Sequence, residues 1–479
     1  MKKLAQALAV ALICILSVGC AGGAKYKADV VVIGAGGAGL AAANTAADNG
    51  VKVILIEKMP FAGGATTLAA GSITGTGTKL QTENGVEASA EEFQAELESE
   101  AVYEYDRELV SAHAGYSGKA IDFMADLGVE FFPELEQAPF RHRTKDPYQA
   151  KFVQLALDSL KSKGGEALLN TKATEILKDK DGSVSGVKAI SDGKEITIAA
   201  KAVIIATGDF GANKEMLPVE YRNALNFGPV SSTGDGIKMA ESLGAATVNM
   251  DKVALWGNGI EAAEGLGEYS WGRLLCEFGG IYVNTDGVRF SKDVLDDEEV
   301  AQATFEQEQA GKYVWVVFDQ KIKDALHGLG FPSVVATWDA AKEATELEKN
   351  HNVAKADSIT DLAAKIGVPA EALEDTLSKY NSYVETQSDP EFGRPLFANP
   401  IAEGPYYAMI QRVGIYPTVG GLKIDAEARV LNTSGEPIPG LYAAGDVTGG
   451  VSTNGRDTLV PGMSFGIIAG ENAAEQAKQ

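Results

Sequence analysis

Short, uninterrupted apolar runs recur along this chain, and glycine or an acidic residue follows each of them. Residues 29–33 read Asp-Val-Val-Val-Ile and lead into a glycine cluster, whereas residues 53–56 read Val-Ile-Leu-Ile and end at Glu57. An alanine-rich stretch of helical character, residues 40–48, lies between them. Apolar runs of this length are typical of strands that are buried on both faces of a parallel sheet. The pattern therefore predicts a β-α-β unit.

The same strand signature returns twice, late in the chain as well as near its middle. Residues 201–208 read Lys-Ala-Val-Ile-Ile-Ala-Thr-Gly, and residues 440–446 read Gly-Leu-Tyr-Ala-Ala-Gly-Asp. Between residues 174 and 198, the sequence predicts a hairpin with Asp-Gly turns at 181–182 and 192–193.

From about residue 251 to residue 355, tryptophans and acidic runs interrupt this pattern of short apolar strands. We interpret residues 251–380 as an inserted α+β domain. Residues 29–250 and 381–479 would then form one discontinuous domain of the α/β class, with its last strand and helix supplied by the C-terminal part.

The glycine cluster is spaced as a dinucleotide-binding turn. Gly34, Gly36 and Gly39 follow the first strand directly, and Glu57 ends the next strand 18 residues later. In this motif the first glycine allows a tight turn, the second lets the backbone approach a pyrophosphate and the third lets helix and strand pack closely. The helix N-terminus attracts the phosphates, and the acid accepts hydrogen bonds from a ribose.

The N-terminal residues have the pattern of an export signal. Lys2 and Lys3 precede an apolar stretch, residues 4–18, which ends in Gly19-Cys20. We expect residues 1–19 to be a lipoprotein-type signal peptide and residues 20–28 to be a tether. Lipidation of Cys20 would anchor the protein on the extracytoplasmic face of the cell membrane, and ordinary secretion is the alternative.

Composition narrows the chemistry further. The net charge of −24 argues against a nucleic-acid partner. The chain has 3 cysteines and 4 histidines, without a haem-attachment motif, an iron–sulfur cysteine set or a metal-ligand cluster in the sequence. We therefore expect redox chemistry to run on an organic cofactor and expect no metal site.

Four separated motifs together resemble the fumarate reductase/succinate dehydrogenase flavoprotein family, and in particular its flavocytochrome c branch with the 3-ketosteroid dehydrogenase relatives. These motifs are residues 34–39, Gly63-Gly64, residues 233–237 (Thr-Gly-Asp-Gly-Ile) and residues 440–450. Further similarities lie at residues 287–290, 380–381, 392–394 and 404–408.

The resemblance implies a Rossmann-like FAD-binding domain with an inserted capping domain that closes over the cofactor. It implies non-covalent FAD, because no histidine stands in residues 63–71, where covalent relatives attach the flavin. By similarity, Glu57 would hold the AMP ribose and Asp446 the ribityl chain. The implied cofactor-binding residues are Gly34, Gly36, Gly37, Ala38, Gly39, Glu57, Lys58, Gly63, Gly64, Thr66, Gly71, Ala206, Thr207, Gly208, Asp235, Gly445 and Asp446.

The resemblance also implies three catalytic candidates. Arg456 corresponds to a family arginine that clamps a substrate carboxylate, and Tyr416 stands where the family has a substrate histidine. Arg273 occupies the place of a family glutamate in the proton path. The family's proton-donating arginine has no counterpart in residues 291–301, so fumarate and succinate are poor candidates for the substrate. Tyr416, with Tyr269 and other aromatic residues, favours a larger substrate.

The leading hypothesis is an exported FAD-dependent reductase of an activated C=C bond in an α,β-unsaturated carboxylate or enone. It would serve anaerobic respiration, with electrons from a separate protein such as a quinol-linked cytochrome or a flavin carrier. A 3-ketosteroid-type dehydrogenase is the first alternative, and a non-catalytic electron-transfer flavoprotein is the second.

Overall fold

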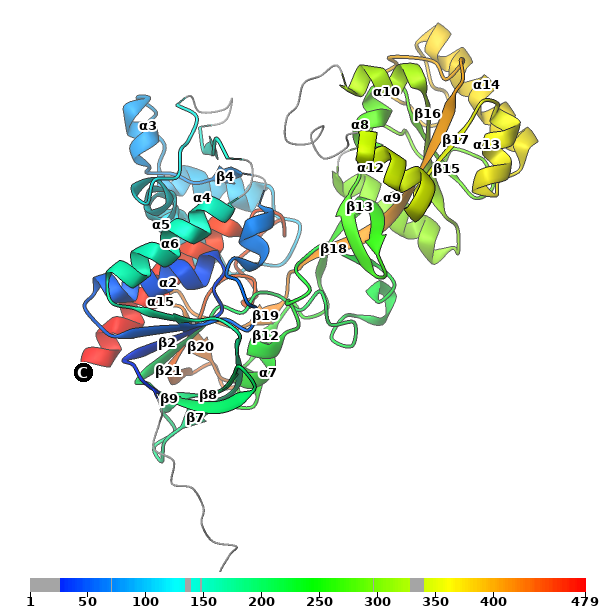
Figure 1. The fold of residues 1–479 in the computed structure, drawn as a ribbon. Helices are drawn as coiled ribbons and strands as arrows, with labels where there is room; N and C mark the ends of the chain where they lie inside the picture. Colours follow the sequence, from blue (N-terminus) through cyan, green and yellow to red (C-terminus); the bar gives the residue numbers. More distant parts are fainter. Residues whose placement is uncertain (1–25, 70, 134–138, 147–148, 296, 328–339) are drawn as a thin grey trace, which may run out of the picture.

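The computed structural model describes residues 26–69, 71–133, 139–146, 149–295, 297–327 and 340–479. The predicted signal peptide and Cys20 lie outside these residues. The described chain forms two lobes, and the C-terminus lies on the first of them (Figure 1).

A mainly parallel sheet lies at the centre of the first lobe. Its strand order is β20-β21-β10-β2-β3-β6, and only β20 pairs in the antiparallel direction. The strands β2, β3 and β10 are buried along their whole length, as their apolar runs predicted. The bounds are β20 (Arg429–Leu431), β21 (Pro437–Ala443), β10 (Ala202–Ile205), β2 (Val30–Ile33), β3 (Val53–Ile56) and β6 (Glu166–Leu168).

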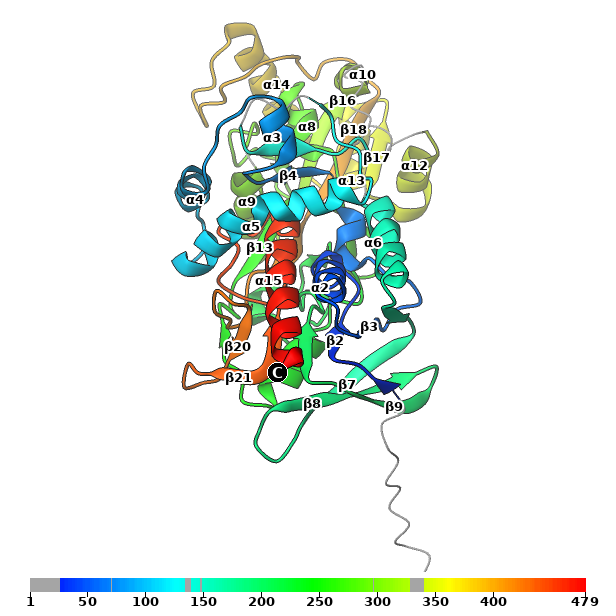
Figure 2. The same ribbon diagram turned by 90° about the vertical axis from the view of Figure 1, so that its left-hand side faces the viewer.

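Two helices from opposite ends of the chain pack against each other on this sheet. Helix α2 (Gly37–Asp48) and helix α15 (Leu459–Lys478) lie side by side in both ribbon views (Figures 1 and 2). Their seam is built from small residues: a Cβ on Gly466 would lie 2.4 Å from the carbonyl oxygen of Ala38, and one on Gly470 would lie 2.6 Å from that of Ala42. The close approach therefore requires glycine.

The remaining elements of the first lobe flank this core. The predicted hairpin is confirmed as part of an antiparallel β7-β8-β9 meander, with turns at the two Asp-Gly pairs, and β1 adds to its edge. Its strands are β1 (Tyr26–Lys27), β7 (Thr171–Lys178), β8 (Val184–Ser191) and β9 (Lys194–Ala199). Two small sheets comprise β4 (Ser72–Thr74) with β5 (Arg141–Arg143), and β12 (Thr247–Val248) with β19 (Gly421–Leu422). The other helices are η1 (Gly64–Leu68), α3 (Lys79–Glu83), α4 (Ala90–Ser99), α5 (Arg107–Asp126), α6 (Ala150–Ser162), η2 (Val219–Tyr221) and α7 (Asp235–Glu241).

The second lobe is built on a seven-stranded sheet in the described part of the chain. Its strands are β11 (Leu225–Asn226), β13 (Val253–Ala263), β14 (Leu266–Tyr269), β15 (Ile281–Asn284), β16 (Val314–Asp319), β17 (Val353–Ala356) and β18 (Tyr406–Thr418). Its helices are α8 (Gly272–Glu277), α9 (Asp297–Gln309), α10 (Gln320–His327), α12 (Ala340–Thr345), η3 (Glu346–Asn350), α13 (Ile359–Ile366) and α14 (Ala370–Thr386).

The long strand β18 reaches from the second lobe toward the first (Figure 1). It pairs with β13, β16 and β17 in the sheet of the second lobe, although it lies beyond the predicted boundary at residue 380. The sheet also recruits β11, which precedes the predicted boundary at residue 251. Strand pairing thus extends the second lobe past both boundaries that composition suggested.

A buried cluster of ion pairs lies inside the second lobe. Arg289 Nη2 lies 2.6 Å from Asp293 Oδ2 and 2.7 Å from Asp389 Oδ2, and Arg394 Nη1 lies 3.2 Å from Asp293 Oδ2. All four side chains are at most 3% exposed, and the ring of Tyr380 lies beneath Arg394. Three segments that resemble the flavoprotein family, residues 287–290, 380–381 and 392–394, therefore meet in one structural cluster. Removing one partner from such a cluster would leave a buried uncompensated charge.

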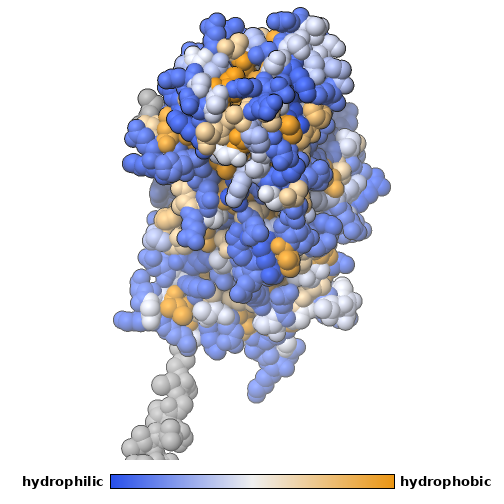
Figure 3. Space-filling view, turned by 90° about the vertical axis from the view of Figure 1, so that its right-hand side faces the viewer, coloured by the Kyte–Doolittle hydropathy of each residue, from blue (hydrophilic) through white to orange (hydrophobic). Residues whose placement is uncertain are grey.

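The face of the second lobe that is turned away from the first is mostly polar. Hydrophilic side chains cover most of it, and apolar ones form small, separate groups (Figure 3). None of the helices in the described part of the chain combines the length and the apolar character that a bilayer crossing requires.

The glycine seam between α2 and α15 gives a first test. We expect Gly466→Ala to lower the free energy of unfolding by about 1–3 kcal/mol, because the new methyl group meets a backbone oxygen at 2.4 Å. Gly115→Ala is the matched control: this exposed glycine on α5 has open space around it, so alanine should be neutral or stabilise the helix. Denaturant unfolding measures both, and equal effects of the two changes would refute the seam.

Candidate cofactor and substrate site

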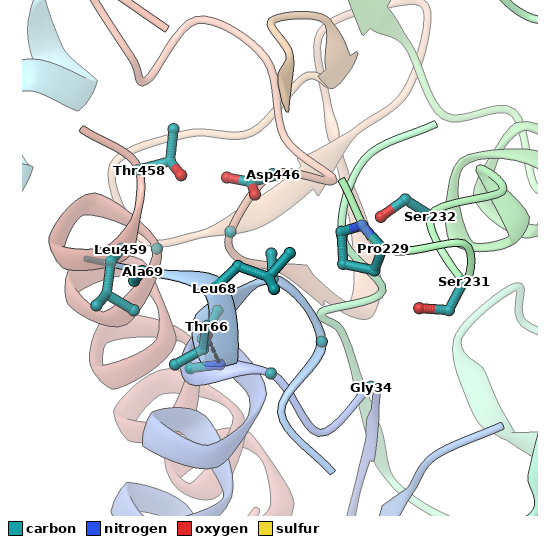
Figure 4. Close-up of a pocket in the computed structure, with 18 of the residues that line it drawn as sticks. Gly34, Thr66, Leu68, Ala69, Pro229, Ser231, Ser232, Asp446, Thr458 and Leu459 are labelled. Carbon is teal, nitrogen blue, oxygen red and sulfur yellow. Dashed lines mark hydrogen bonds between the residues drawn. The ribbon is translucent and has the colours of Figure 1, made fainter. Parts of the chain in front are cut away.

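One large cavity of about 830 Å³ lies at the carboxyl ends of the parallel strands and continues to the second lobe. Residues that follow β2, β3, β10 and β21 line it, as expected for a nucleotide site in a parallel α/β sheet. In Figure 4, Asp446 and Thr458 form one wall, Pro229, Ser231 and Ser232 form the opposite wall, and Leu68 projects between them.

The glycine turn at the start of α2 fits a cofactor phosphate. Gly34 has a φ of +106°, and a Cβ there would lie 2.2 Å from the carbonyl oxygen of Ala206. At Gly36 the nearest protein atom would be 3.7 Å from a Cβ, and at Gly64 none lies within 4 Å. The protein's own packing thus leaves space in front of these two residues. A dinucleotide phosphate would use that space.

Two helix N-termini converge on the cavity. Gly37 and Ala38 of α2 line it together with Leu459 and Gly462 of α15. The backbone N–H of Gly37 already donates a hydrogen bond to Thr66 Oγ1 at 2.8 Å, the dashed line in Figure 4. Thr66 therefore holds the turn that it was predicted to share with the cofactor. The partial positive charges of both helix ends favour an anionic group between them.

The predicted ribose end contains an ordered carboxylate. Glu57 accepts hydrogen bonds from the backbone N–H of Ala35 and of Met59, each at 2.9 Å. These bonds orient the side chain, and a carboxylate still has further lone pairs for a diol. Its position at the cavity wall fits the predicted role.

Lys58 and Asp235 form an ion pair beside Glu57. Lys58 Nζ lies 2.7 Å from Asp235 Oδ2 and donates to Thr233 Oγ1 at 2.8 Å. Burial acts to raise the pKa of Asp235, but the hydrogen bond and charge of Lys58 outweigh it, so that the pKa is lowered. Lys172, 3.6 Å from the same carboxylate, adds to this effect. The pair joins Lys58 to the motif at residues 233–237, which is 177 residues away in the sequence.

Asp446 lies near a second acid that sequence reasoning did not place in the site. Asp209 is 2% exposed and accepts a hydrogen bond from the backbone N–H of Thr418 at 3.0 Å. Burial, followed by the charge of Asp209, raises the pKa of Asp446 to about 7, although a hydrogen bond with Thr458 opposes the shift. The sequence offered one signal, since Asp209 replaces a glycine that is usual in the resembling family.

Part of the cavity lining is aromatic, and we define Phe227, Trp256, Tyr269 and Tyr416 as the aromatic wall. The indole N–H of Trp256 donates to the backbone oxygen of Tyr416 at 2.6 Å, and the rings of Trp256 and Tyr269 meet edge to face at 5.8 Å. The guanidinium carbon of Arg456 lies 5.0 Å from the centre of the Trp256 ring. A cation is thereby held against an apolar surface.

Burial and the charges of Asp446 and Asp209 raise the pKa of Tyr416 well above 10, so its hydroxyl remains a hydrogen-bond donor at neutral pH. Arg456 and Tyr416 thus line the same cavity, as two of the three catalytic candidates. The third, Arg273, is not among the lining residues: it lies on α8, and its Nη1 is 2.9 Å from Glu277 Oε1.

The structure brings most of the predicted cofactor residues to the cavity wall, and the exceptions are Gly39, Gly63 and Gly71. Gly39 packs instead against the backbone of Gly34, where a Cβ would lie 1.9 Å from its oxygen. Residues that sequence reasoning missed include Phe227, Pro229, Ser231, Ser232 and Thr458. They come from irregular loops, whose sequences carry no motif.

Comparison with known proteins shows the family to which this chain belongs. The family model described as "FAD binding domain" matches residues 29–457. A probable fumarate reductase of Shewanella frigidimarina is 31% identical over 473 residues, which cover 95% of this chain and 76% of that protein. Other relatives are named as reductases of acrylate, urocanate and vinyl phenol. The chain spans 48% of one further relative, the NADH:fumarate oxidoreductase of Klebsiella pneumoniae.

Solved structures give the same result. The open conformation of a flavocytochrome c3 fumarate reductase superposes with a TM-score of 0.81 at 29% identity, covering 100% of this chain and 81% of that one. A 3-ketosteroid dehydrogenase from Rhodococcus jostii gives 0.71 at 26% identity, covering 96% and 99%. The resemblance inferred from the motifs is confirmed, as is the α/β fold.

Asp446 generates a pH prediction for the flavin-free protein. Its pKa is about 7 when folded, against an ordinary value of 3.8, so the folded state binds the proton more tightly. Stability contributed by that proton is therefore lost as the pH rises from about 4 to about 7, with a slope of at most about 1.4 kcal/mol per pH unit. Asp446→Asn should remove this component.

The measurement is denaturant unfolding of the wild type and of the variant across that pH range. Asp375→Asn, at an exposed position on α14, is the matched control and should leave the profile unchanged. Parallel profiles of the wild type and Asp446→Asn would show that Asp446 does not titrate in this range.

Proposed function

This chain belongs to the FAD-binding family of flavoprotein oxidoreductases, and on that premise we propose that it is an exported reductase of an activated C=C bond in an α,β-unsaturated carboxylate. A separate electron-donor protein, either a quinol-linked cytochrome or a flavin carrier, supplies its electrons. A terminal step of anaerobic respiration is the corresponding cellular role.

The position of Arg456 is the observation that carries this proposal. Arg456 packs on the aromatic wall, in the same cavity whose glycine turn fits the FAD phosphates. FAD supplies hydride chemistry at its isoalloxazine ring when it is bound. A planar guanidinium binds a carboxylate through two parallel hydrogen bonds. In this position it would hold the substrate and stabilise the negative charge that develops beside its carboxylate.

Tyr416, on strand β18, supports the same chemistry. Its protonated hydroxyl is a donor toward a substrate oxygen, and its hydrogen bond with Thr458 links it to the Asp446 side of the cavity. Arg273 stays a prediction for the proton path, two residues after Trp271 of the cavity wall. Closure of the second lobe along β18 would exclude water from the reacting atoms.

A dehydrogenase that places a C=C bond next to a ketone is the second candidate. Tyr416 favours it, because a neutral phenol polarises a ketone oxygen, and the fold similarity to a 3-ketosteroid dehydrogenase supports it. Arg456 argues for the acid reductase, since a ketone needs no cationic clamp. A non-catalytic electron-transfer flavoprotein is the third candidate, and the aromatic wall argues against it.

Arg456 gives the decisive test. Arg456→Gln should lower kcat/KM for an unsaturated acid about 10²–10³-fold, on the scale of losing a charge-stabilising donor, while the FAD content remains unchanged. Arg456→Lys keeps the charge but loses the planar fork, so it should recover only part of the activity. The control is Arg107→Gln, because the Arg107 side chain is 78% exposed. Wild-type turnover in Arg456→Gln, followed as flavin reoxidation, would exclude the clamp.

Cys20 tests the proposed location. In a bacterial host, Cys20→Ala should abolish the incorporation of a labelled fatty acid and move the protein from the membrane fraction to the soluble fraction. The control is Cys276→Ala, since Cys276 is fully buried in the second lobe and should not affect labelling. Absence of label in the wild-type protein would contradict the lipid anchor and leave ordinary secretion.

A further inference from the structure

The reduction of a C=C bond needs a proton donor, and the second lobe contributes charged groups to the cavity. One carbon of the bond receives the hydride that bound FAD supplies, and the neighbouring carbon receives a proton. Glu268 and Lys342 are the charged residues of the second lobe within the described lining of the cavity. Arg273, which the sequence predicted for the proton path, is not among the lining residues.

Lys342 belongs to a cluster of ion pairs, which we define as Lys342, Glu268 and Glu346. Its Nζ lies 2.7 Å from Glu346 Oε1, and it also pairs with Glu268. Glu346 is fully buried, and its two oxygens accept hydrogen bonds from the side-chain amides of Asn350 at 2.9 Å and of Asn352 at 2.6 Å. The buried carboxylate is therefore fixed at both oxygens, and it holds the ammonium at the cavity wall.

The sheet of the second lobe positions Glu268. This residue lies on β14 directly after Gly267, whose Cβ would come within 2.3 Å of the Phe227 ring. Gly259 on β13 and Gly414 on β18 pack against the same ring, with Cβ positions 2.8 and 2.3 Å from it. Because this packing fixes β14, Glu268 stays beside the cavity. Its side chain is 39% exposed, against 23% for its lysine partner, so it links the ammonium to solvent.

Contacts across the aromatic wall connect this cluster with the proposed substrate clamp. The guanidinium carbon of Arg456 lies 5.0 Å from the centre of the Trp256 ring, and Trp256 meets Tyr269 edge to face at 5.8 Å. Tyr269 follows Glu268 directly on β14. The clamp and the cluster thus lie on connected parts of one cavity wall.

The two acids keep Lys342 charged. Burial acts to lower the pKa of Lys342, but the hydrogen bonds and charges of Glu268 and Glu346 outweigh it, so that the pKa is raised. The side chain is therefore an ammonium at neutral pH, with protons to donate. A carbon that gains negative charge during the reduction is a suitable acceptor for one of them.

We propose that Lys342 is the proton donor of this reductase, that Glu268 returns the proton from solvent and that Glu346 positions the ammonium. This inference rests on the proposed reductase function. As the π bond breaks, one carbon takes the hydride and its neighbour takes a proton from Nζ, whose N–H electron pair stays on nitrogen. The neutral amine then regains a proton from water through Glu268. Two electrons and two protons are added in all, and the electrons are those that the donor protein delivers.

The test uses the full-length flavoprotein, reduced anaerobically with dithionite, and follows flavin reoxidation by fumarate, acrylate and cinnamate. The acid that reoxidises the wild type fastest is then used with Lys342→Ala. We expect kcat to fall about 10²–10⁴-fold, the contribution of a positioned general acid, with little change in KM. Lys349→Ala, at an exposed position on η3, is the matched control and should behave as the wild type.

Two further readouts separate proton donation from a structural role of Lys342. Ferricyanide takes electrons singly and forms no C–H bond, so it should reoxidise reduced Lys342→Ala as fast as the wild type. Added methylamine should restore part of the lost kcat with the unsaturated acid, because its ammonium form replaces the missing donor. A lysine that only anchored its helix would slow both acceptors alike.

The outcomes distinguish this inference from the proposed function. Wild-type kcat in Lys342→Ala overturns the proton donor and leaves the reductase function standing, and so do equal losses with ferricyanide and the acid. If Lys342→Ala does not fold with bound flavin, the ferricyanide comparison is made with Lys342→Met, which keeps a long side chain. No reoxidation of the wild type by any of the three acids, although ferricyanide reoxidises it, overturns the reductase function itself.

The positioning role of Glu346 has its own readout in the pH profile. Glu346→Gln removes a negative charge beside the ammonium of Lys342, so the pH at which kcat falls on the alkaline side should move to a lower value. Glu348→Gln, at an exposed position on the same helix, is the control and should leave the profile unchanged. An unmoved alkaline limb in Glu346→Gln overturns this role.

Discussion

The close packing of α2 against α15 is the constraint on which the site depends. Gly466 and Gly470 let the last helix of the chain lie against the carbonyl oxygens of Ala38 and Ala42, near the start of the first helix. Gly462 continues the seam, because a Cβ on this residue would lie 3.2 Å from the Cα atom of Gly445. Any larger side chain would separate the two helices. Because they are adjacent, both N-termini point at one cavity, and the phosphate turn and Asp446 become parts of a single wall.

The cavity divides its chemistry between two ends. At the end near Glu57, charged groups are paired and oriented: Lys58 with Asp235, and Glu57 with two backbone N–H groups. Along the aromatic wall, rings line the cavity, and Arg456 lies over the Trp256 ring. A polar nucleotide suits the first environment, and the second presents an apolar surface beside the Arg456 guanidinium. Strand β18 connects them, since it carries Tyr416 in the cavity and pairs along its length in the second lobe.

Several elements were predictable because their signals are local. The buried strands β2, β3 and β10 are read from apolar runs, and the phosphate turn is read from glycine spacing. The boundaries of the second lobe were harder to predict. Composition places its end at residue 380, but β18 adds residues 406–418 to the sheet, because strand pairing is decided by partners distant in sequence. Phe227 was missed for the same reason, since its three glycine neighbours lie on three different strands.

The sequence by itself determined the class of fold, the cofactor and the family, since each rests on short motifs whose own residues are adjacent in the chain. It also marked Arg456, through a motif of the resembling family. Only the tertiary structure decided that Arg456 faces Trp256, that Asp209 is buried where it raises the pKa of Asp446, and that Arg273 pairs with Glu277. The physical reason is that charge and contact depend on distance in space, and burial sets how strongly each group senses its neighbours.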